Sequence, residues 1–408
     1  MGLDITITLS KKRMTYCMLL VVIMFLYMPP LIFAVDPSRN LAYKISRSSA
    51  AIISATQILV FVFSRRVTGK IYPLLIGVFL FTIEVSNLHF GYAFDKTTSF
   101  VIDAINIFGV SCMLFNLHSN ERMDLFFNSF IAYTSILSIS NLLTQVFNYK
   151  YGLYHNFKLS WQAYYLCGNP NAFVFFYTIT LAVIYATAYR YNLYRLKVYG
   201  YFVNACMIYS TYLGKSTTGM VCAFLFLILN FIFDTRIVRF IVNNSVIFLT
   251  AFVVFAISVF WFIGLRGWYL DSIKELISNT VHEKRNLLTR GEIWDFAIKR
   301  IKKEPILGYG SINPQLSFSK SAGIKRSAHN TFLQILLYGG VTAFGIYLLL
   351  LVIAVIKASF GSNKWRVEYV LAFFIYMLSF VFEQNPFYIG FYILLVLMFL
   401  ESGDRQKG

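Results

Sequence analysis

Apolar runs long enough to cross a lipid bilayer recur along the whole sequence. A spanning helix needs about 20 mainly apolar residues, and 58% of the 408 residues are hydrophobic while only 13% are charged. Soluble domains carry about 25% charged residues. Because backbone polar groups find no water in hydrocarbon, such runs must form helices. The sequence therefore predicts an all-α, polytopic integral membrane protein.

We expect about twelve transmembrane helices in a single membrane domain that covers residues 1–408. The second, seventh and twelfth of the predicted spans are short, so eleven is the alternative count. No cleavage site follows the first span, which we therefore interpret as a retained anchor and not as a signal peptide. The predicted spans are 14–34, 48–63, 71–88, 98–117, 125–147, 171–189, 199–213, 218–234, 245–264, 329–357, 367–383 and 386–401.

The distribution of lysine and arginine predicts the orientation. If the N-terminus is cytoplasmic, the cytoplasmic segments hold 17 of the 36 basic residues and the short outer loops hold 7. Cytoplasmic loops carry the excess of basic residues in membrane proteins. The other 12 lie in 265–328, a segment long enough to escape this rule. We expect both termini in the cytoplasm and 265–328 to be one large periplasmic or extracellular loop containing amphipathic helices.

The formal net charge of +18 has two interpretations. One is topology together with attraction to anionic lipid head groups. The other is an anionic substrate. The basic residues are scattered between apolar spans and do not gather on a soluble module, which argues against a nucleic-acid partner. The five cysteines have no CxxC spacing, so we expect no cysteine metal site.

A helix is predicted near the end of the large loop. Thr289 to Glu292 has the form of a capping box, and an apolar face follows, made of Ile293, Trp294, Ala297 and Ile301. Such a helix rests on the bilayer surface or on the bundle. Arg290 falls in its first turn, where free N–H groups favour anions. Arg290 therefore has two interpretations: it binds a phosphate group, or its side chain faces solvent or lipid without a binding role.

Ser327-Ala328-His329-Asn330 precedes the tenth predicted span. A positively charged imidazole is disfavoured at a helix N-terminus, so His329 there would stay neutral and could accept a proton. The structural alternative is an amphipathic anchor at the membrane interface. His282, in the same loop, is the rival candidate.

Two turns fall on the same predicted side of the membrane. Gly214 to Gly219 contains one cation, Lys215, and lacks the glycine spacing of a P-loop. Gly168-Asn169-Pro170-Asn171 has the composition of a helix start. Glu84 and Asp103 are isolated carboxylates within spans, which argue only weakly for a proton-coupled transporter. Asp-x-Asp does not occur, so a metal-bridged diphosphate site has no obvious ligands.

In combination these motifs resemble the bacterial O-antigen ligase/polymerase superfamily. The resemblance covers residues 160–350 by motif and the whole chain by topology. Each motif is short, and their order makes the combination specific. Lys215 stands where many members have an arginine. The motifs are Arg290-Gly291-Glu292-Ile293-Trp294, Pro305 to Gly310, His329 to Gln334 with Gly339 and Gly340, and Gly168 to Asn171.

The resemblance implies a GT-C-like membrane glycosyltransferase of the bacterial cytoplasmic (inner) membrane. Its donor would be an undecaprenyl diphosphate-linked glycan, used without metal or cofactor on the outer face, with inversion at the anomeric carbon. His329 would be the catalytic base. Arg290 would bind the diphosphate, with Lys215 and Arg266 assisting. Supporting positions would be Asn330, Asn169, Tyr309 and His282.

The choice within the superfamily rests on two stretches. Gly339-Gly340-Val341-Thr342 lacks the ending seen in many ligases, and Pro305 to Gly310 looks more like polymerase members. We therefore expect a polymerase of O-antigen, capsule or exopolysaccharide repeat units. A ligase that transfers the finished glycan to lipid A-core or protein is the alternative. A lipid-linked sugar flippase is the second alternative. A chain-length regulator and a flippase of the same pathway are the expected partners.

Overall fold

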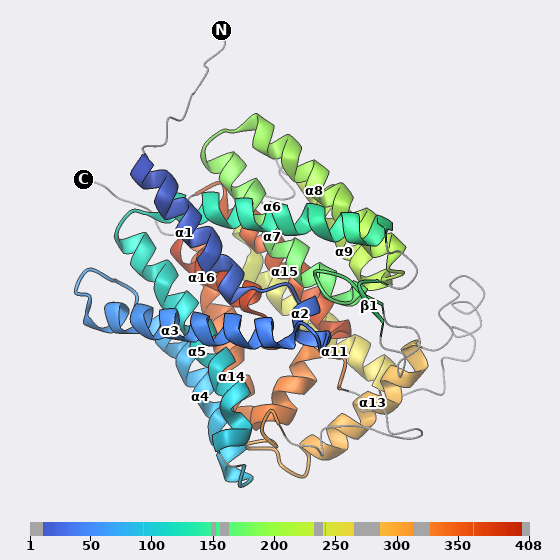
Figure 1. Cartoon of the computed structure of the whole chain (residues 1–408). Coiled ribbons are helices and arrows are strands. Elements are labelled where there is room, and N and C mark those ends of the chain that lie inside the picture. Colours follow the sequence, from blue (N-terminus) through green and yellow to red (C-terminus); the bar gives the residue numbers. More distant parts are fainter. Residues whose placement is uncertain are drawn as a thin grey trace. The chain divides into compact units, whose positions relative to one another are not determined.

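The structure is a computed structural model of the whole chain, and Figure 1 shows its helices in sequence colours. It consists of two compact units. Unit 1 comprises residues 1–68 and 109–227, and unit 2 comprises 69–108 and 228–408. The residues that the structure describes are 11–92, 94–147, 152–155, 163–231, 240, 242–264, 286–312, 327–361 and 363–401.

Unit 1 is built from helices and one very short hairpin. The hairpin pairs β1 (Tyr154–His155) with β2 (Ala163–Tyr164) in antiparallel register, a detail that an all-α prediction leaves out. The helices are α1 (Lys11–Tyr27), α2 (Ile32–Val35), α3 (Asn40–Phe63), the second half of α5 (Phe94–Ser119), α6 (Met123–Phe147), the 3-10 helix η2 (Pro170–Ala172), α7 (Phe173–Arg190), α8 (Tyr194–Leu213) and most of α9 (Thr217–Phe231).

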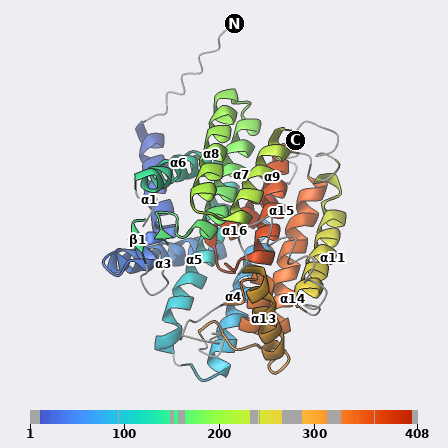
Figure 2. The same cartoon turned by 90° about the vertical axis from the view of Figure 1, so that its right-hand side faces the viewer.

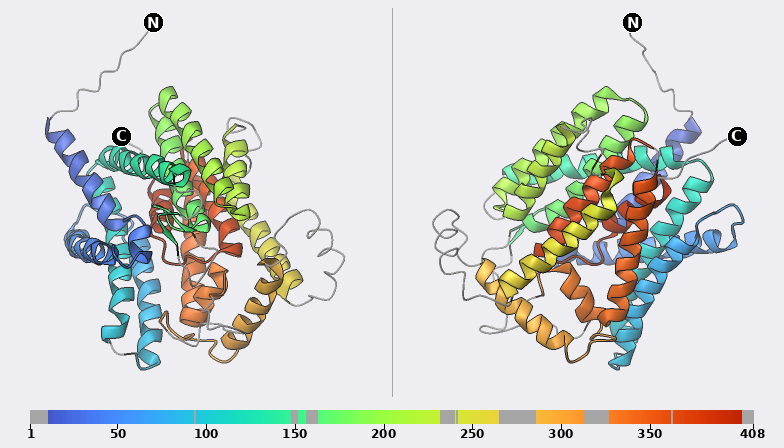
Figure 3. Two further views of the ribbon diagram at one scale, coloured as in Figure 1. Left: turned by 45° about the vertical axis from the view of Figure 1, so that its right-hand side comes forward. Right: turned by 180° about the vertical axis from the view of Figure 1, so that it is seen from behind.

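Helix α7 is the core of unit 1. Its side chains are buried from Phe173 to Ala188 on every face, because α6 and α8 both pack against it. A helix that is apolar all round is expected in such a position. Figure 3 shows α7 and α8 lying antiparallel.

Unit 2 holds α4 (Ile71–His89), the first half of α5, α11 (Ser245–Gly264), α13 (Asn286–Ile301), α14 (Thr331–Phe360), α15 (Arg366–Phe382) and α16 (Ile389–Leu400). Helix α14 contacts each of the other helices α4, α11, α13, α15 and α16. Eleven of the twelve α16 residues are buried. These contacts make α14 and α16 the core of unit 2.

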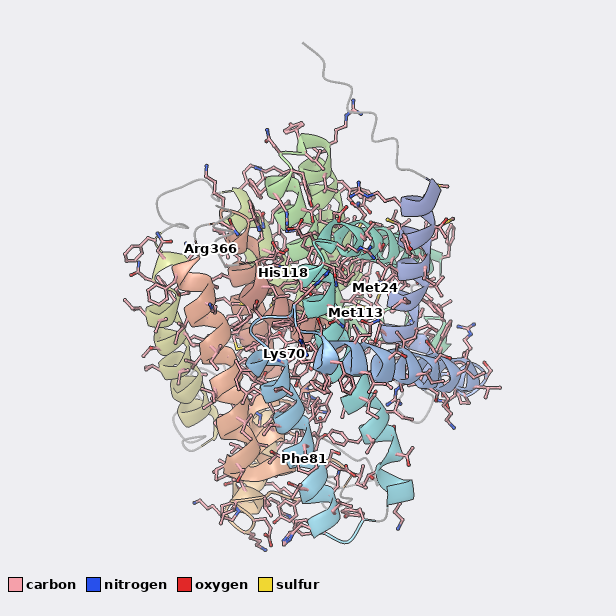
Figure 4. The ribbon with its side chains drawn as sticks, turned by 90° about the vertical axis from the view of Figure 1, so that its left-hand side faces the viewer. Met24, Lys70, Phe81, Met113, His118 and Arg366 are labelled. Atoms are coloured by element: carbon pink, nitrogen blue, oxygen red, sulfur yellow. The ribbon has the colours of Figure 1, made fainter. Side chains whose placement is uncertain are left out.

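The helices of unit 2 alternate in direction and so define two ends. At one end the first turn of α14 meets the end of α15, where Thr331 Oγ1 donates to the carbonyl of Glu383 at 2.9 Å. At the other end Asn363, just after α14, donates to the carbonyl of Glu401 at 2.8 Å. We call these the His329 end and the Arg366 end. Figure 4 labels Arg366, and Lys70 just before α4.

Within the described ranges, seven helices are long and apolar enough to cross a membrane, and three shorter helices are also apolar. These ten, with α8 and α15, overlap all twelve predicted spans. Large apolar side chains such as Phe63, Phe81 and Phe147 are more than half exposed, and Figure 4 shows Phe81 on the surface of α4. Exposed phenylalanines along spanning helices suit contact with lipid. The protein is a polytopic membrane protein.

Helix α14 is broken, although the sequence predicts one continuous span there. Gly339 and Gly340 have non-helical backbone angles, and Gly340 has a φ of +61°. The break separates a short half-helix, 331–338, from the long helix 341–360. Two consecutive glycines allow this because Gly340 carries no Cβ in its left-handed conformation.

Candidate functional site

The candidate site lies at the His329 end of unit 2, where α13 packs on the half-helix of α14. Trp294 of α13 is fully buried beside Ala328 and Leu337. Its indole Nε1 donates to the carbonyl of Ala328 at 3.0 Å. Ile293, Ala297 and Ile301 also face this contact. The predicted apolar face of the loop helix is therefore confirmed, and it rests on the bundle (Figure 2).

His329 follows Ala328 directly and has a positive φ of +47°. The left-handed region is uncommon for residues other than glycine and occurs most often at turns or functional positions. The imidazole is half-buried. Because Ala328 is held by Trp294, and its own N–H donates to Gln334 Oε1 at 3.0 Å, the backbone on this side of His329 is fixed.

Asn330 fixes the backbone on the other side of His329. It is the N-cap of α14, and its Oδ1 accepts from the N–H of Leu333 at 3.0 Å. Its Nδ2 donates to the carbonyl of Val381 in α15 at 3.0 Å. Thr331 adds a second tie to the turn after α15, since its Oγ1 accepts from the N–H of Asn385 at 3.1 Å. His329 thus sits between two anchored residues at a helix N-terminus.

The segment 305–311 fills the break in α14, and we call it the clamp. The N–H groups of Tyr309 and Gly310 donate to the carbonyls of Leu337 and Tyr338 at 2.7 and 2.8 Å. In the other direction, the N–H of Val341 donates to the carbonyl of Pro305 at 2.8 Å. The clamp therefore supplies hydrogen bonds that a continuous helix would make internally.

Two glycines make this close approach possible. A Cβ at Gly308 would lie 2.6 Å from the nitrogen of Gly340 and 2.6 Å from the carbonyl oxygen of Leu337. A Cβ at Gly340 would overlap the carbonyl of Ile306. Tyr309 joins the clamp to α13, because its hydroxyl donates to the carbonyl of Arg300 at 3.1 Å. Its ring stacks on Phe90 with centroids 5.4 Å apart.

Position 290 lies one helical turn before Trp294 on α13. Residues four apart share a helix face, so the backbone places 290 on the side that carries Trp294. The helix begins at Asn286, about one turn earlier than predicted. Thr289 is therefore inside the helix and is not its cap, since the chain continues helically through Leu287 and Leu288, which are good helix formers. Arg266 and His282 lie outside the described residues.

Unit 1 brings the other two motifs together. Asn169 caps η2, where its Oδ1 accepts from the N–H of Ala172 at 2.9 Å. Gly214 packs directly on Pro170, which leaves no room for a Cβ. Lys215 follows in a left-handed conformation with a φ of +53° and is exposed. Burial raises the pKa of Tyr164, and its side-chain hydrogen bond with Asn169 acts in the opposite direction.

Several residues of the candidate site are not recognisable from their motifs. Asn87 of α4 is fully buried, and its Oδ1 accepts from the N–H of Ser311 in the clamp at 2.8 Å. Thr331, Glu383 and Asn385 join α14 to α15. The only sequence signal for Asn87 is its place within an apolar span, three residues after Glu84. Among the described residues, no three His, Cys, Asp or Glu side chains gather as metal ligands.

Residues 202–348 match the model of the family described as O-antigen ligase (Wzy_C). This segment, about a third of the chain, is similar to the O-antigen ligase family. A comparison with curated proteins gave no match. The resemblance drawn from short motifs is confirmed at the level of the family. Proteins of the O-antigen ligase family are membrane proteins involved in surface polysaccharide synthesis.

The matched residues run from α8 to the middle of α14. They include every predicted site residue except Asn169: His329, Arg290, Lys215, Arg266, Asn330, Tyr309 and His282. They also include the clamp and the break in α14. The matched segment therefore contains α13, the clamp and the first part of α14, whereas Val381 and Asn385, which bond to Asn330 and Thr331, lie outside it.

Proposed function

We propose that this protein is a polymerase that joins undecaprenyl diphosphate-linked oligosaccharide repeat units into a surface polysaccharide. The reaction takes place at the outer face of the cytoplasmic membrane. The single observation that supports it best is the placement of His329. This imidazole is half-buried at a helix N-terminus, with its backbone anchored on both sides, within the segment that is similar to the O-antigen ligase family.

His329 acts as the general base in this proposal. The imidazole takes the proton of an acceptor sugar hydroxyl, and the oxygen attacks the anomeric carbon of the donor glycan. The bond between that carbon and the phosphate oxygen breaks, and undecaprenyl diphosphate leaves with the electron pair. Attack from the opposite face inverts the anomeric centre. A fixed base contributes about 10²–10⁴-fold to such a step.

Arg290 stabilises the diphosphate leaving group in this proposal. A guanidinium can pair with phosphate through two parallel hydrogen bonds, and fixed cations stabilise charge that develops in the transition state. The α13 backbone supports the role, since position 290 shares a helix face with Trp294, which bonds to the residue before His329. Lys215 and Arg266 are the proposed additional cations, and Lys215 contributes a point charge.

The outer-face location follows from the census of basic residues. The Arg366 end of unit 2 carries Lys357 in the last turn of α14, Lys364 in the turn that follows, and Arg366 at the start of α15. An excess of basic residues marks cytoplasmic loops, so the His329 end is proposed to face the periplasm or exterior. The census of the whole sequence likewise leads us to propose that both chain termini are cytoplasmic.

Polymerase is proposed over ligase because of the residues that form the break. The Gly339-Gly340-Val341-Thr342 sequence lacks the ending seen in many ligases, and Pro305 to Gly310, within the clamp, looks more like polymerase members. Both stretches are parts of one hydrogen-bonded arrangement. A ligase that transfers the finished glycan to lipid A-core or protein is the alternative.

A flippase for the same lipid-linked sugars is a second candidate, and the break in α14 is the observation that favours it. Broken spanning helices line substrate sites in transporters. A flippase would move the lipid-linked glycan across the bilayer without lengthening it.

Purified protein in vesicles with a lipid-linked repeat unit tests these proposals. A ladder of longer lipid-linked glycans is expected. Transfer to added lipid A-core without a ladder would replace the polymerase by the ligase, and movement across the vesicle membrane without any transfer would replace it by the flippase. His329→Ala is the control, because it should remove the ladder while the protein still inserts.

A further inference from the structure

Two polar residues of α4, the half-buried Glu84 and the buried Asn87, are joined to the clamp by hydrogen bonds. Asn87 is fully buried, and its Nδ2 donates to Glu84 Oε2 at 2.8 Å. Its Oδ1 accepts from the N–H of Ser311 at 2.8 Å. The same Nδ2 also reaches Ser311 Oγ at 3.3 Å. One amide therefore joins α4 to a segment that lies 224 residues further along the chain.

The clamp that Asn87 holds is the partner of the broken α14. Gly310, next to Ser311, donates to the carbonyl of Tyr338, the last residue of the half-helix. A Cβ at Gly310 would overlap the side chain of Asn87, so the two backbones are in close contact. His329 directly precedes Asn330, the N-cap of the half-helix 331–338. A continuous series of hydrogen bonds thus leads from Glu84 through Asn87 and the clamp to the half-helix.

An asparagine can present either its oxygen or its nitrogen toward Ser311. Only the oxygen can accept from the Ser311 N–H. The Glu84 carboxylate accepts only, so it selects the orientation in which Nδ2 faces α4 and Oδ1 faces the clamp. The carboxylate therefore fixes the direction of the amide that holds the clamp.

We propose that Glu84 and Asn87 are a positioning pair, which holds the clamp and through it the half-helix that presents His329. The pair acts through other residues and does not touch the substrate. This inference rests on the proposed function for its effect on catalysis. It also predicts a structural effect that does not depend on any reaction, namely protection of the clamp amides.

The rival interpretation is that Glu84 itself handles a ligand or a proton. Its second oxygen, Oε1, is buried and has no hydrogen-bond partner among the described residues. Carboxylates within spans are often functional. A direct role requires a carboxylate at position 84. The positioning role requires only a hydrogen bond between the side chains at 84 and 87.

Exchanging the carboxylate and the amide between positions 84 and 87 distinguishes the positioning role from a direct role of Glu84. Asn87→Asp alone sets two carboxylates against each other and removes the donor to Glu84. Glu84→Gln alone keeps a carbonyl acceptor for Asn87. In the double variant Glu84→Gln/Asn87→Asp the hydrogen bond is reversed, because the introduced glutamine amide donates to the introduced aspartate carboxylate. That carboxylate still accepts from the Ser311 N–H. Ser311→Ala is the matched control, since it keeps this main-chain donor and loses only the weaker Oγ contacts.

The first measurement is amide hydrogen exchange over residues 305–311 and 337–342. Asn87→Asp should speed exchange about tenfold or more, consistent with loss of a buried hydrogen bond. The double variant should return to the wild-type rate, and Ser311→Ala and Glu84→Gln should stay close to it. Unchanged exchange in Asn87→Asp, or a double variant no slower than Asn87→Asp, would overturn the positioning role.

The second measurement is glycan extension with the lipid-linked repeat unit. Asn87→Asp should lower kcat about tenfold or more while KM for the donor changes little, and the double variant should recover. A severe loss in Glu84→Gln without rescue in the double variant would overturn the proposal and favour a direct role of the carboxylate. If exchange responds as expected but the wild-type protein makes no glycan ladder, the proposed function fails and the structural role of the pair stands.

Discussion

The indole of Trp294 donates a hydrogen bond of 3.0 Å to the carbonyl of Ala328, the residue directly before His329. This bond joins α13 to the start of α14 across 34 residues of chain. It fixes the peptide that leads into the left-handed conformation of His329. The helix that carries Arg290 and the residue proposed as the base are therefore parts of one packed arrangement within unit 2.

Trp294→Phe should weaken this arrangement without emptying the core. The phenyl ring keeps most of the packing, while the carbonyl of Ala328 loses its buried donor at a cost of about 1–3 kcal/mol. We expect a lower melting temperature and a clear fall in glycan extension. Trp365→Phe is the matched control, since it removes an indole bond to Glu401 at the Arg366 end. Equal activity losses in the two variants would argue against a specific role of Trp294.

His329→Asn should stop glycan extension in a protein that still folds and inserts. Asparagine tolerates a positive φ better than most residues, so it suits the observed +47° better than alanine does. It cannot act as a base. His89→Asn is the control, because His89 is exposed at the end of α4. Cells with this variant should make glycan chains of normal length. Normal chain lengths in cells that carry only His329→Asn would remove the base role.

The sequence predicts the membrane bundle well because its signal is strong. Each apolar run of sufficient length must form a helix in lipid, and a helix occupies all twelve predicted places. The apolar face of α13 is likewise predicted by its spacing, and Ile293, Trp294 and Ala297 are all buried. Helix starts are less well predicted, as α13 shows, because a local capping pattern competes with the helix-forming residues before it.

The site is only partly predictable from the sequence. The motifs indicate His329, Asn330 and Tyr309, but the role of Asn330 as a cap that also bonds to Val381 depends on how α15 packs. The break at Gly339 and Gly340 depends on a clamp that lies about 30 residues earlier in the chain. The tie between Asn87 and Ser311 joins residues 224 apart. Such long-range partners leave no periodic pattern in either segment.

Arg290→Ala should abolish glycan extension, and Arg290→Lys should restore little of it. The expected reason is that lysine supplies one charged point where a diphosphate requires two parallel hydrogen bonds. Lys299→Ala is the control on the same helix, because Lys299 is exposed and pairs with Asp295 at 2.6 Å. Turnover of the lipid-linked repeat unit measures the effect. Full activity in Arg290→Lys would contradict a bidentate grip at this position.

Lys215→Gln should raise KM for the lipid-linked donor about tenfold, while Lys215→Arg should keep or improve activity. The proposal gives Lys215 a supporting charge on the diphosphate, and arginine stands at this place in many members of the superfamily. Arginine also retains the positive charge. Lys197→Gln, in α8 of the same unit, is the control for general loss of basic charge. Normal donor KM in Lys215→Gln would show that this residue takes no part in binding.

Gly340→Ala should destabilise the protein far more than Gly345→Ala, although both lie in α14. At Gly340 the φ of +61° disfavours any Cβ, and the carbonyl of Ile306 occupies the space that a Cβ needs. At Gly345 an added Cβ meets no atom within 4 Å. Alanine there should stabilise the helix by about 0.5–1 kcal/mol, whereas Gly340→Ala should cost about 2 kcal/mol or more. Thermal unfolding in detergent measures both, and glycan extension should fall only in Gly340→Ala because the clamp no longer fits the break. Equal stabilities of the two variants would show that the clamp does not require a glycine at the break.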